Sequence, residues 1–148
     1  MTPRPGSILS GEKQRASSVA LRLVIIGGLA VDAVIHLQLA PVYQLAAPGG
    51  IGQGNLFRVE AGLALVAALL LLVRPSRITY AFAFAVAAGG LVAVLLYRYV
   101  DVPALGPIPS MYEPLWFAKK TATAVAEAAA AVGALTGLLR RTQSVPPR

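Results

Sequence analysis

Two acidic residues and a histidine lie inside apolar stretches of this sequence that are long enough to cross a membrane. Asp32 and His36 are four residues apart in the first stretch, and Glu127 lies in the last. An ionisable side chain at the bilayer centre costs at least about 2.5–3.5 kcal/mol. Because carboxylates and imidazole can bind a ligand, relay protons or hold a metal ion, these three residues are the first candidates for a polar site.

Other polar residues are expected at a similar depth. Gly28, Asp32 and His36 are spaced by four residues and form one stripe on a helix, and Thr123 precedes Glu127 by one helical turn. We predict a polar site shared between packed helices and opening toward the outer face, with no catalytic residue assigned. Its members are Asp32, His36, Glu127, Arg58, Glu60 and Thr123.

Three interpretations of these residues stay open. The sequence slightly favours a structural role, in which Asp32 pairs with His36 or an arginine and a neutral Glu127 hydrogen-bonds Thr123 or a facing helix. A pocket for a quinone headgroup, a lipid headgroup or a small polar solute is the second, and a proton path belongs with it. The third is a metal ion held by Asp32 and His36 with Glu127 or Glu60.

The metal interpretation is the weakest on sequence alone. Helical bundles that hold metals repeat a Glu-x-x-His motif, whereas this chain has one histidine. Haem with two histidine ligands is excluded within one chain for the same reason. We therefore predict no metal site, and the sequence leaves any cofactor unknown.

Composition identifies the solvent of this protein as lipid. Hydrophobic residues make up 57% of the chain, charged residues only 13%, and the mean hydropathy is +0.70. The net charge of +7 comes from basic residues that flank apolar segments, so we interpret it as a topology signal rather than as nucleic-acid binding. The chain lacks cysteine and a Gly-x-Ser-x-Gly motif, and nothing in it predicts an enzyme.

The apolar segments predict an all-α, four-helix transmembrane bundle. Each is close to the roughly 20 residues needed to cross the hydrocarbon core. The spans are expected at residues 19–40, 56–73, 78–99 and 115–139, the first ending at Pro41 because proline cannot donate to the helix ladder. Residues 1–18 would form an N-terminal arm, 19–140 the membrane domain and 141–148 a tail.

Basic residues set the expected orientation. Nine of the thirteen lie on the side of the arm, the tail and the second-to-third turn, and four lie on the other. Short cytoplasmic loops are enriched in Lys and Arg. Both termini are therefore predicted to be cytoplasmic, in a multi-pass protein of the inner (plasma) membrane.

Small and aromatic residues indicate how the helices pack and where the bilayer ends. Gly28 in the first span and Gly133 and Gly137 in the last are predicted to allow close helix packing. The proline-rich loop before the last span ends in a predicted interfacial anchor, with a ligand-covering lid as the alternative. The anchor consists of Tyr112, Trp116, Lys119 and Lys120.

Two sequence blocks carry a resemblance to a known kind of protein. HLQLAPVYQ follows the first span and GPIPSMYEPLWFAKK precedes the last. With its Ala, Val and Arg usage, the chain resembles small four-helix membrane proteins of high-GC bacteria and is similar in layout to the DoxX-like group. That resemblance implies a bacterial inner membrane, and no motif matches closely enough to transfer a site.

The sequence predicts a non-enzymatic membrane protein and two roles for it. The first is an accessory or assembly subunit of a larger membrane complex, which could be respiratory, because the chain is small and has packing faces and a shaped outer loop. The alternative is a small carrier or ligand- or quinone-binding protein that uses the polar site. Its expected partners are the lipid bilayer and either complex subunits or further copies of itself.

Overall fold

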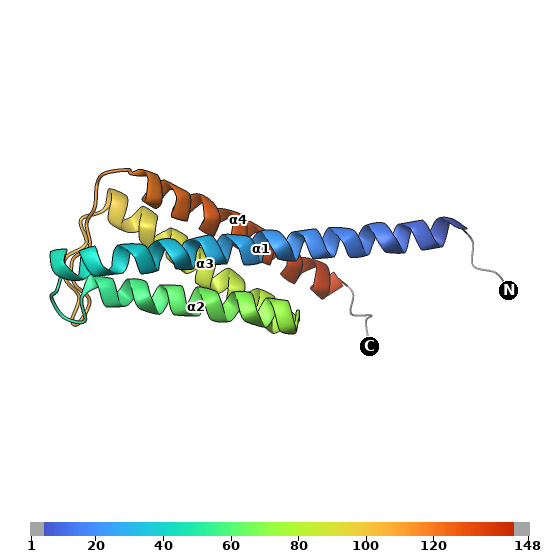
Figure 1. Cartoon of the computed structure of the whole chain (residues 1–148), viewed down its shortest axis with the longest axis horizontal. Helices are drawn as coiled ribbons and strands as arrows, with labels where there is room; N and C mark the ends of the chain where they lie inside the picture. The colour runs from blue at the N-terminus through green and yellow to red at the C-terminus, as the bar shows by residue number, and fades with distance from the viewer. Residues whose placement is uncertain (1–4, 144–148) are drawn as a thin grey trace.

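The described residues, 5–143, form four helices joined into an up-and-down bundle (Figure 1). The computed structural model gives α1 as Pro5–Ala46, α2 as Gln53–Val73, α3 as Arg77–Tyr99 and α4 as Ala118–Gln143. All four are long and apolar enough to cross a membrane, and residues 5–143 contain no strand. The predicted fold class, an all-α four-helix transmembrane bundle, is confirmed.

The two ends of the bundle differ in structure. The loops 47–52 and 100–117 lie together at one end, which we call the loop end, and the short α2–α3 turn lies toward the other, the terminal end (Figure 1). The N-terminus of α1 and the C-terminus of α4 extend from the terminal end. Residues 1–4 of the predicted arm and 144–148 of the predicted tail lie outside the described residues.

The prediction that the first helix ends at Pro41 is wrong. Pro41 lies inside α1, which continues to Ala46. A proline this close to a helix end removes one hydrogen bond, and the final turn regains contacts through its side chains. Tyr43 packs against Phe57 with ring centroids 5.0 Å apart, and Gln44 accepts a hydrogen bond from the backbone of Asn55.

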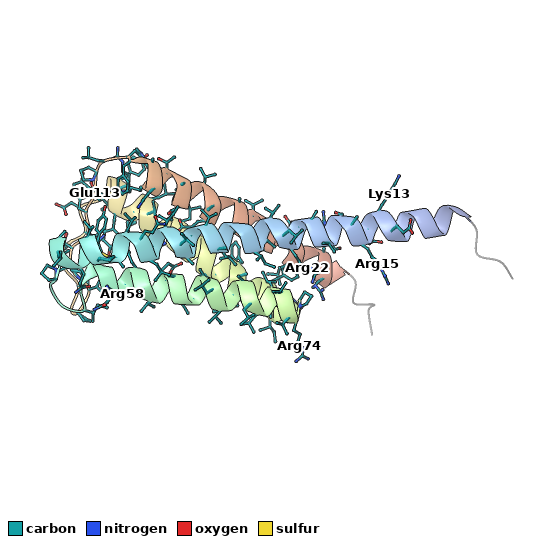
Figure 2. The ribbon with its side chains drawn as sticks, viewed as in Figure 1. Lys13, Arg15, Arg22, Arg58, Arg74 and Glu113 are labelled. Atoms are coloured by element: carbon teal, nitrogen blue, oxygen red, sulfur yellow. The ribbon has the colours of Figure 1, made fainter. Side chains whose placement is uncertain are left out.

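The N-terminal part of α1, with Lys13 and Arg15, projects beyond the other helices (Figure 2). α1 has 42 residues, which corresponds to about 63 Å at the helical rise and is about twice the thickness of the hydrocarbon core. Lys13 and Arg15 are exposed on this projection. Residues 5–18 of the predicted arm are thus a continuation of the first helix. At the other end of the sequence α4 begins at Ala118, three residues later than predicted, and runs to Gln143.

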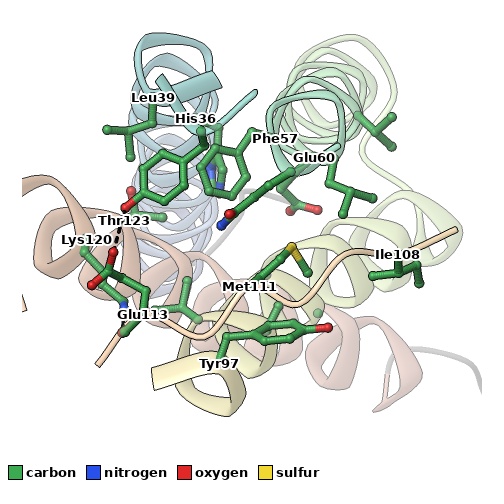
Figure 3. A pocket seen from close by; sticks show the side chains of 18 of the residues that line it. His36, Leu39, Phe57, Glu60, Tyr97, Ile108, Met111, Glu113, Lys120 and Thr123 are labelled. Atoms are coloured by element: carbon green, nitrogen blue, oxygen red, sulfur yellow. Dashed lines mark hydrogen bonds between the residues drawn. The ribbon is translucent and has the colours of Figure 1, made fainter. Parts of the chain in front are cut away.

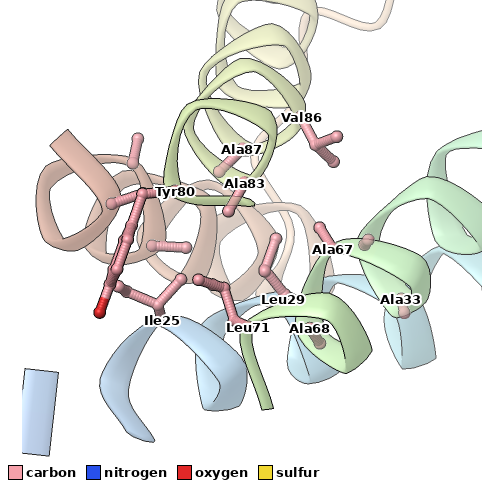
Figure 4. Close-up of a cluster of buried hydrophobic side chains, with 14 of the residues drawn as sticks. Ile25, Leu29, Ala33, Ala67, Ala68, Leu71, Tyr80, Ala83, Val86 and Ala87 are labelled. Carbon is pink, nitrogen blue, oxygen red and sulfur yellow. The ribbon is translucent and has the colours of Figure 1, made fainter. Parts of the chain in front are cut away.

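Alanines and a few larger side chains fill the terminal half of the bundle (Figure 4). Ile25, Leu29, Leu71 and Tyr80 are almost completely buried there, among alanines from all four helices. Large apolar side chains on the outside of the helices remain exposed, as expected where the solvent is lipid. The terminal half is therefore a dry layer beneath the polar residues of the loop half.

Glycines let α4 approach its neighbours closely. A Cβ atom at Gly28 would lie 2.7 Å from the backbone oxygen of Ala126, and one at Gly133 would lie 2.8 Å from Ile25 Cγ1. A Cβ atom at Gly137 would collide with the ring of Tyr80. The three glycines predicted to serve helix packing thus lie at contacts that a side chain would obstruct.

Gly28 and its neighbour Gly27 provide a matched test of this packing. Gly28→Ala should destabilise the protein by about 1–3 kcal/mol, because the new methyl group meets a backbone carbonyl that cannot move aside. Nothing lies within 4 Å of a Cβ atom at Gly27, so Gly27→Ala should leave stability unchanged or raise it slightly. Thermal unfolding in detergent, followed by circular dichroism, measures both. Equal melting temperatures for the two variants would contradict the close α1–α4 contact.

Candidate functional site

Asp32, His36 and Glu127 converge inside the bundle. Potential ligand atoms of the three side chains all lie within 4.8 Å of one another, and Asp32 and Glu127 are each only 1% exposed. His36 Nδ1 lies 2.7 Å from Asp32 Oδ1 and 3.1 Å from the backbone oxygen of the same residue. Because α1 packs directly on α4, the two buried acids of the sequence form one cluster.

Glu60 and Gly90 bring the remaining two helices to this cluster. A Cβ atom at Gly90 would collide with Glu127 Oε1 and would lie 3.0 Å from Glu60 Oε1. The carboxyls of α4 and α2 therefore both approach the backbone of α3 at the position that lacks a side chain. Sequence analysis did not identify Gly90, although the Gly89–Gly90 pair in an apolar helix is a signal for close approach.

Several oxygen atoms of the cluster have no hydrogen-bond partner among the described residues. They are both carboxyl oxygens of Glu127, Oε1 of Glu60 and Oγ1 of Thr123 when the carboxyls are ionised. A proton on Glu127 or Asp32 would let these two carboxyls hydrogen-bond to each other. A buried polar group left unpaired costs about 1–3 kcal/mol, and more when it is charged. Carboxyls this close together in hydrocarbon also repel strongly when ionised. The cluster is therefore incomplete as it stands and has capacity for protons, a cation or a ligand.

The other predicted site residues separate into two groups. Thr123 is buried one turn from Glu127, and Glu60 is half-buried at the cluster. Arg58 is exposed and donates from Nη1 to Asn55 Oδ1 over 2.7 Å, so the structure places it outside the cluster. Its position follows from the helix period, since residues two apart on α2 point in different directions.

A cavity of about 320 Å³ connects the cluster to the loop end (Figure 3). His36, Glu60 and Thr123 line its inner end, which we call the floor, and aromatic and aliphatic side chains form its walls. Among the wall residues are Leu39, Phe57, Val94, Tyr97 and Met111. Phe57 also packs edge-on against His36, with ring centroids 4.9 Å apart. The cavity thus has a polar floor and mainly apolar walls.

The loop 100–117 covers the loop end of the cavity. Ile108, Met111, Glu113 and Phe117 from this loop line the cavity. The Glu113 N–H donates to Tyr97 O over 3.0 Å, and Tyr43 donates its hydroxyl to Glu113 Oε2 over 3.5 Å. These hydrogen bonds attach the loop to α3 and α1.

The loop 47–52 supports the cover from the side. Ile51 donates its backbone N–H to Pro107 O over 2.8 Å. Gly50 has a φ of 61° and leaves no room for a Cβ atom against the carbonyl of Pro107. The two loops therefore form one structure over the cavity.

The residues predicted to anchor the chain at the membrane interface do not share one environment. Tyr112, Trp116 and Lys119 are exposed, as an anchor requires. Lys120 is buried, lines the cavity and donates from Nζ to the backbone oxygen of Glu113. Lys120 thus holds the loop in place from inside, because its position on the first turn of α4 points it at the bundle axis.

We infer that the cavity opens between α2 and α3. This pair makes the least contact of the neighbouring helix pairs. Val59, Gly89 and Ala93 from these two helices line the cavity and are exposed. A molecule dissolved in the bilayer therefore has a lateral route to the polar floor.

Searches against protein-family models, curated proteins and solved structures found no match to this chain. The similarity in layout to the DoxX-like group stays an expectation. The chemistry of the site is therefore argued from its own geometry.

Replacing Glu127 tests whether its carboxyl stabilises the fold or serves binding at the cost of stability. Met has nearly the shape of Glu and removes a buried carboxyl that lies beside two others, so Glu127→Met should raise the stability of the protein, by up to about 4 kcal/mol. The measurement is thermal unfolding in detergent with a chelator present. Glu12→Met, which changes an exposed glutamate on the projecting part of α1, serves as control. A lower melting temperature for Glu127→Met would show that the Glu127 carboxyl stabilises the fold.

Proposed function

We propose that this protein binds a lipid-soluble molecule with a hydrogen-bonding headgroup, and that the cavity is its binding site. The observation that carries the proposal is the combination of a buried polar floor with apolar walls that reach the lipid. An amphiphilic ligand needs this arrangement, because its headgroup must find polar partners while its tail stays in hydrocarbon. A water-soluble solute would gain nothing from an opening between α2 and α3.

A quinone headgroup fits the chemistry of the floor. Its carbonyl oxygens accept hydrogen bonds, and the hydroxyl of Thr123 is a donor on the floor of the cavity. Nε2 of His36 is a second donor when the imidazole is protonated, because Nδ1 is paired with Asp32. The hydroxyl of Thr123 has no partner among the described residues, so a ligand would supply one. A cavity of about 320 Å³ suits a ring and the first carbons of its tail, and the rest would extend between α2 and α3.

The buried carboxyls give such a site a way to exchange protons with its ligand. Glu60 and His36 line the cavity, and Asp32 and Glu127 lie directly behind them. The dry layer around Ile25, Leu29 and Leu71 separates these groups from the terminal end. Proton exchange would therefore take place with the loop end.

The same dry layer favours binding over transport. A carrier would have to open the packed contacts of the terminal half, whereas a binding protein uses the cavity as it is. The accessory-subunit role predicted from the sequence stays a separate prediction, because it depends on a partner chain.

Two glycine replacements test the location of the ligand. Gly89→Phe should weaken binding at least tenfold by filling the cavity, since a Cβ atom there meets nothing within 4 Å and the helix itself is undisturbed. Gly62→Phe is the matched control, because Gly62 is exposed on α2, does not line the cavity and also has open space around it. The probe is a short-chain ubiquinone analogue, titrated into protein in nanodiscs.

Trp116 provides the signal for this titration. It is the single tryptophan of the chain and lies in the loop that covers the cavity, so a bound quinone should quench its fluorescence in a saturable way. Absence of saturable quenching in the unmodified protein would overturn the quinone assignment. Equal affinity in Gly89→Phe and Gly62→Phe would place the ligand outside the cavity.

A further inference from the structure

We propose that Asp32, His36 and Glu127 bind a divalent first-row transition-metal ion at the floor of the cavity. This inference goes beyond the binding of an amphiphile, because the three residues need no cavity ligand to form the site. They come from α1 and α4, the two helices that pack closely at Gly28. From the sequence we predicted no metal site, because the chain has one histidine. In the folded chain, carboxylates from other helices lie beside that histidine and can serve as the further ligands.

The distances between the donor atoms suit one ion. All three residues offer a ligand atom within 4.8 Å of the others, and Asp32 Oδ1 and His36 Nδ1 are already 2.7 Å apart. Two ligand atoms of a tetrahedral zinc site are about 3.4 Å apart for bonds of about 2.1 Å. Small side-chain rotations therefore bring the three atoms onto a common centre, and the ion replaces the proton between Asp32 and His36.

The donors available to Glu127 are the second observation that points to a cation. The residue is 1% exposed, and the described residues offer its carboxyl oxygens no N–H or hydroxyl donor, so that its contact with Asp32 is a hydrogen bond only when a proton lies between the two carboxyls. The carboxyl of Glu60 adds a third acidic group beside it, at Gly90. A divalent ion would supply the positive charge that three carboxyls and one imidazole lack.

The surroundings leave one side of the site open. The dry layer of the terminal half lies beneath Asp32 and Glu127, whereas His36, Glu60 and Thr123 face the cavity. Three protein ligands with an open position toward a cavity are typical of functional rather than purely structural metal sites. Glu60, or the headgroup of a bound ligand, could complete the coordination.

The donor set selects the class of metal. Imidazole nitrogen together with carboxylate oxygen suits zinc, cobalt, iron and manganese ions. Calcium prefers six to eight oxygen ligands and magnesium retains several waters, which a nearly dry site with an imidazole donor does not provide. We therefore assign the site to ions of the zinc type.

Cobalt binding tests the assignment directly. Chelator-stripped protein in detergent is titrated with Co²⁺, whose visible absorption reports nitrogen and oxygen coordination, and Zn²⁺ is then added as competitor. We expect a saturable spectrum at one ion per chain that Zn²⁺ abolishes and that a large excess of Ca²⁺ leaves unchanged. Glu127→Gln and His36→Gln should each weaken binding at least tenfold. Asp101→Asn, at an exposed carboxyl of the loop, should bind as the unmodified protein does.

Substitutions at two adjacent glycines test the metal site even if the variants of the metal-binding residues fail to fold. Gly90→Ala pushes the Glu127 carboxyl aside without altering any ligand, and should weaken Co²⁺ binding. Gly89→Ala meets open space and should not. Gly89→Phe should block the quinone analogue but retain Co²⁺, which separates this inference from the proposed function. Absence of a saturable Co²⁺ spectrum, undiminished binding by Glu127→Gln, or displacement by Ca²⁺ would each overturn the metal site.

Discussion

Carboxyl groups inside an apolar bundle impose the constraint on which the rest of this structure depends. Asp32 and Glu127 are almost fully buried and cannot reach water by snorkelling, so each must find a polar neighbour within the protein. His36 pairs with Asp32, and Glu127 meets them across the α1–α4 contact. Meeting in one cluster lowers the free-energy cost of burying each polar group. It also concentrates negative charge, and oxygen atoms that lack a hydrogen-bond donor remain. The cluster can therefore bind a proton, a cation or a ligand.

The distribution of small residues makes this convergence possible. Gly28 brings α1 against the backbone of α4, and Gly90 leaves room on α3 for the carboxyls of two other helices. Toward the terminal end, alanines and the side chains of Ile25 and Leu71 form a buried hydrophobic core. The bundle therefore has a close-packed half and a hollow half, and the polar cluster lies at the boundary between them.

The two loops turn the hollow half into a defined cavity. Glycine permits the loop 47–52 to approach Pro107, and the loop 100–117 crosses the end of the bundle with a tight turn at residues 105–108. Lys120 and Glu113 then attach that loop from inside. α2 and α3 make the least contact of the neighbouring helix pairs, and the exposed rings of Tyr112 and Trp116 do not line the cavity.

The sequence by itself determined the number of helices, their membrane-spanning character and the burial of Asp32, His36 and Glu127, because these depend on length, hydropathy and the free-energy cost of burying charge. It misplaced the end of the first helix, since the cost of Pro41 is local whereas the contacts of Tyr43 and Gln44 that offset it are tertiary. It also grouped Arg58 with the site and Lys120 with the interface, because residue type does not reveal the direction of a side chain. Only the tertiary structure decided that Asp32, His36 and Glu127 meet, because their contact depends on which helices pack together and on the glycines that set the distance between them.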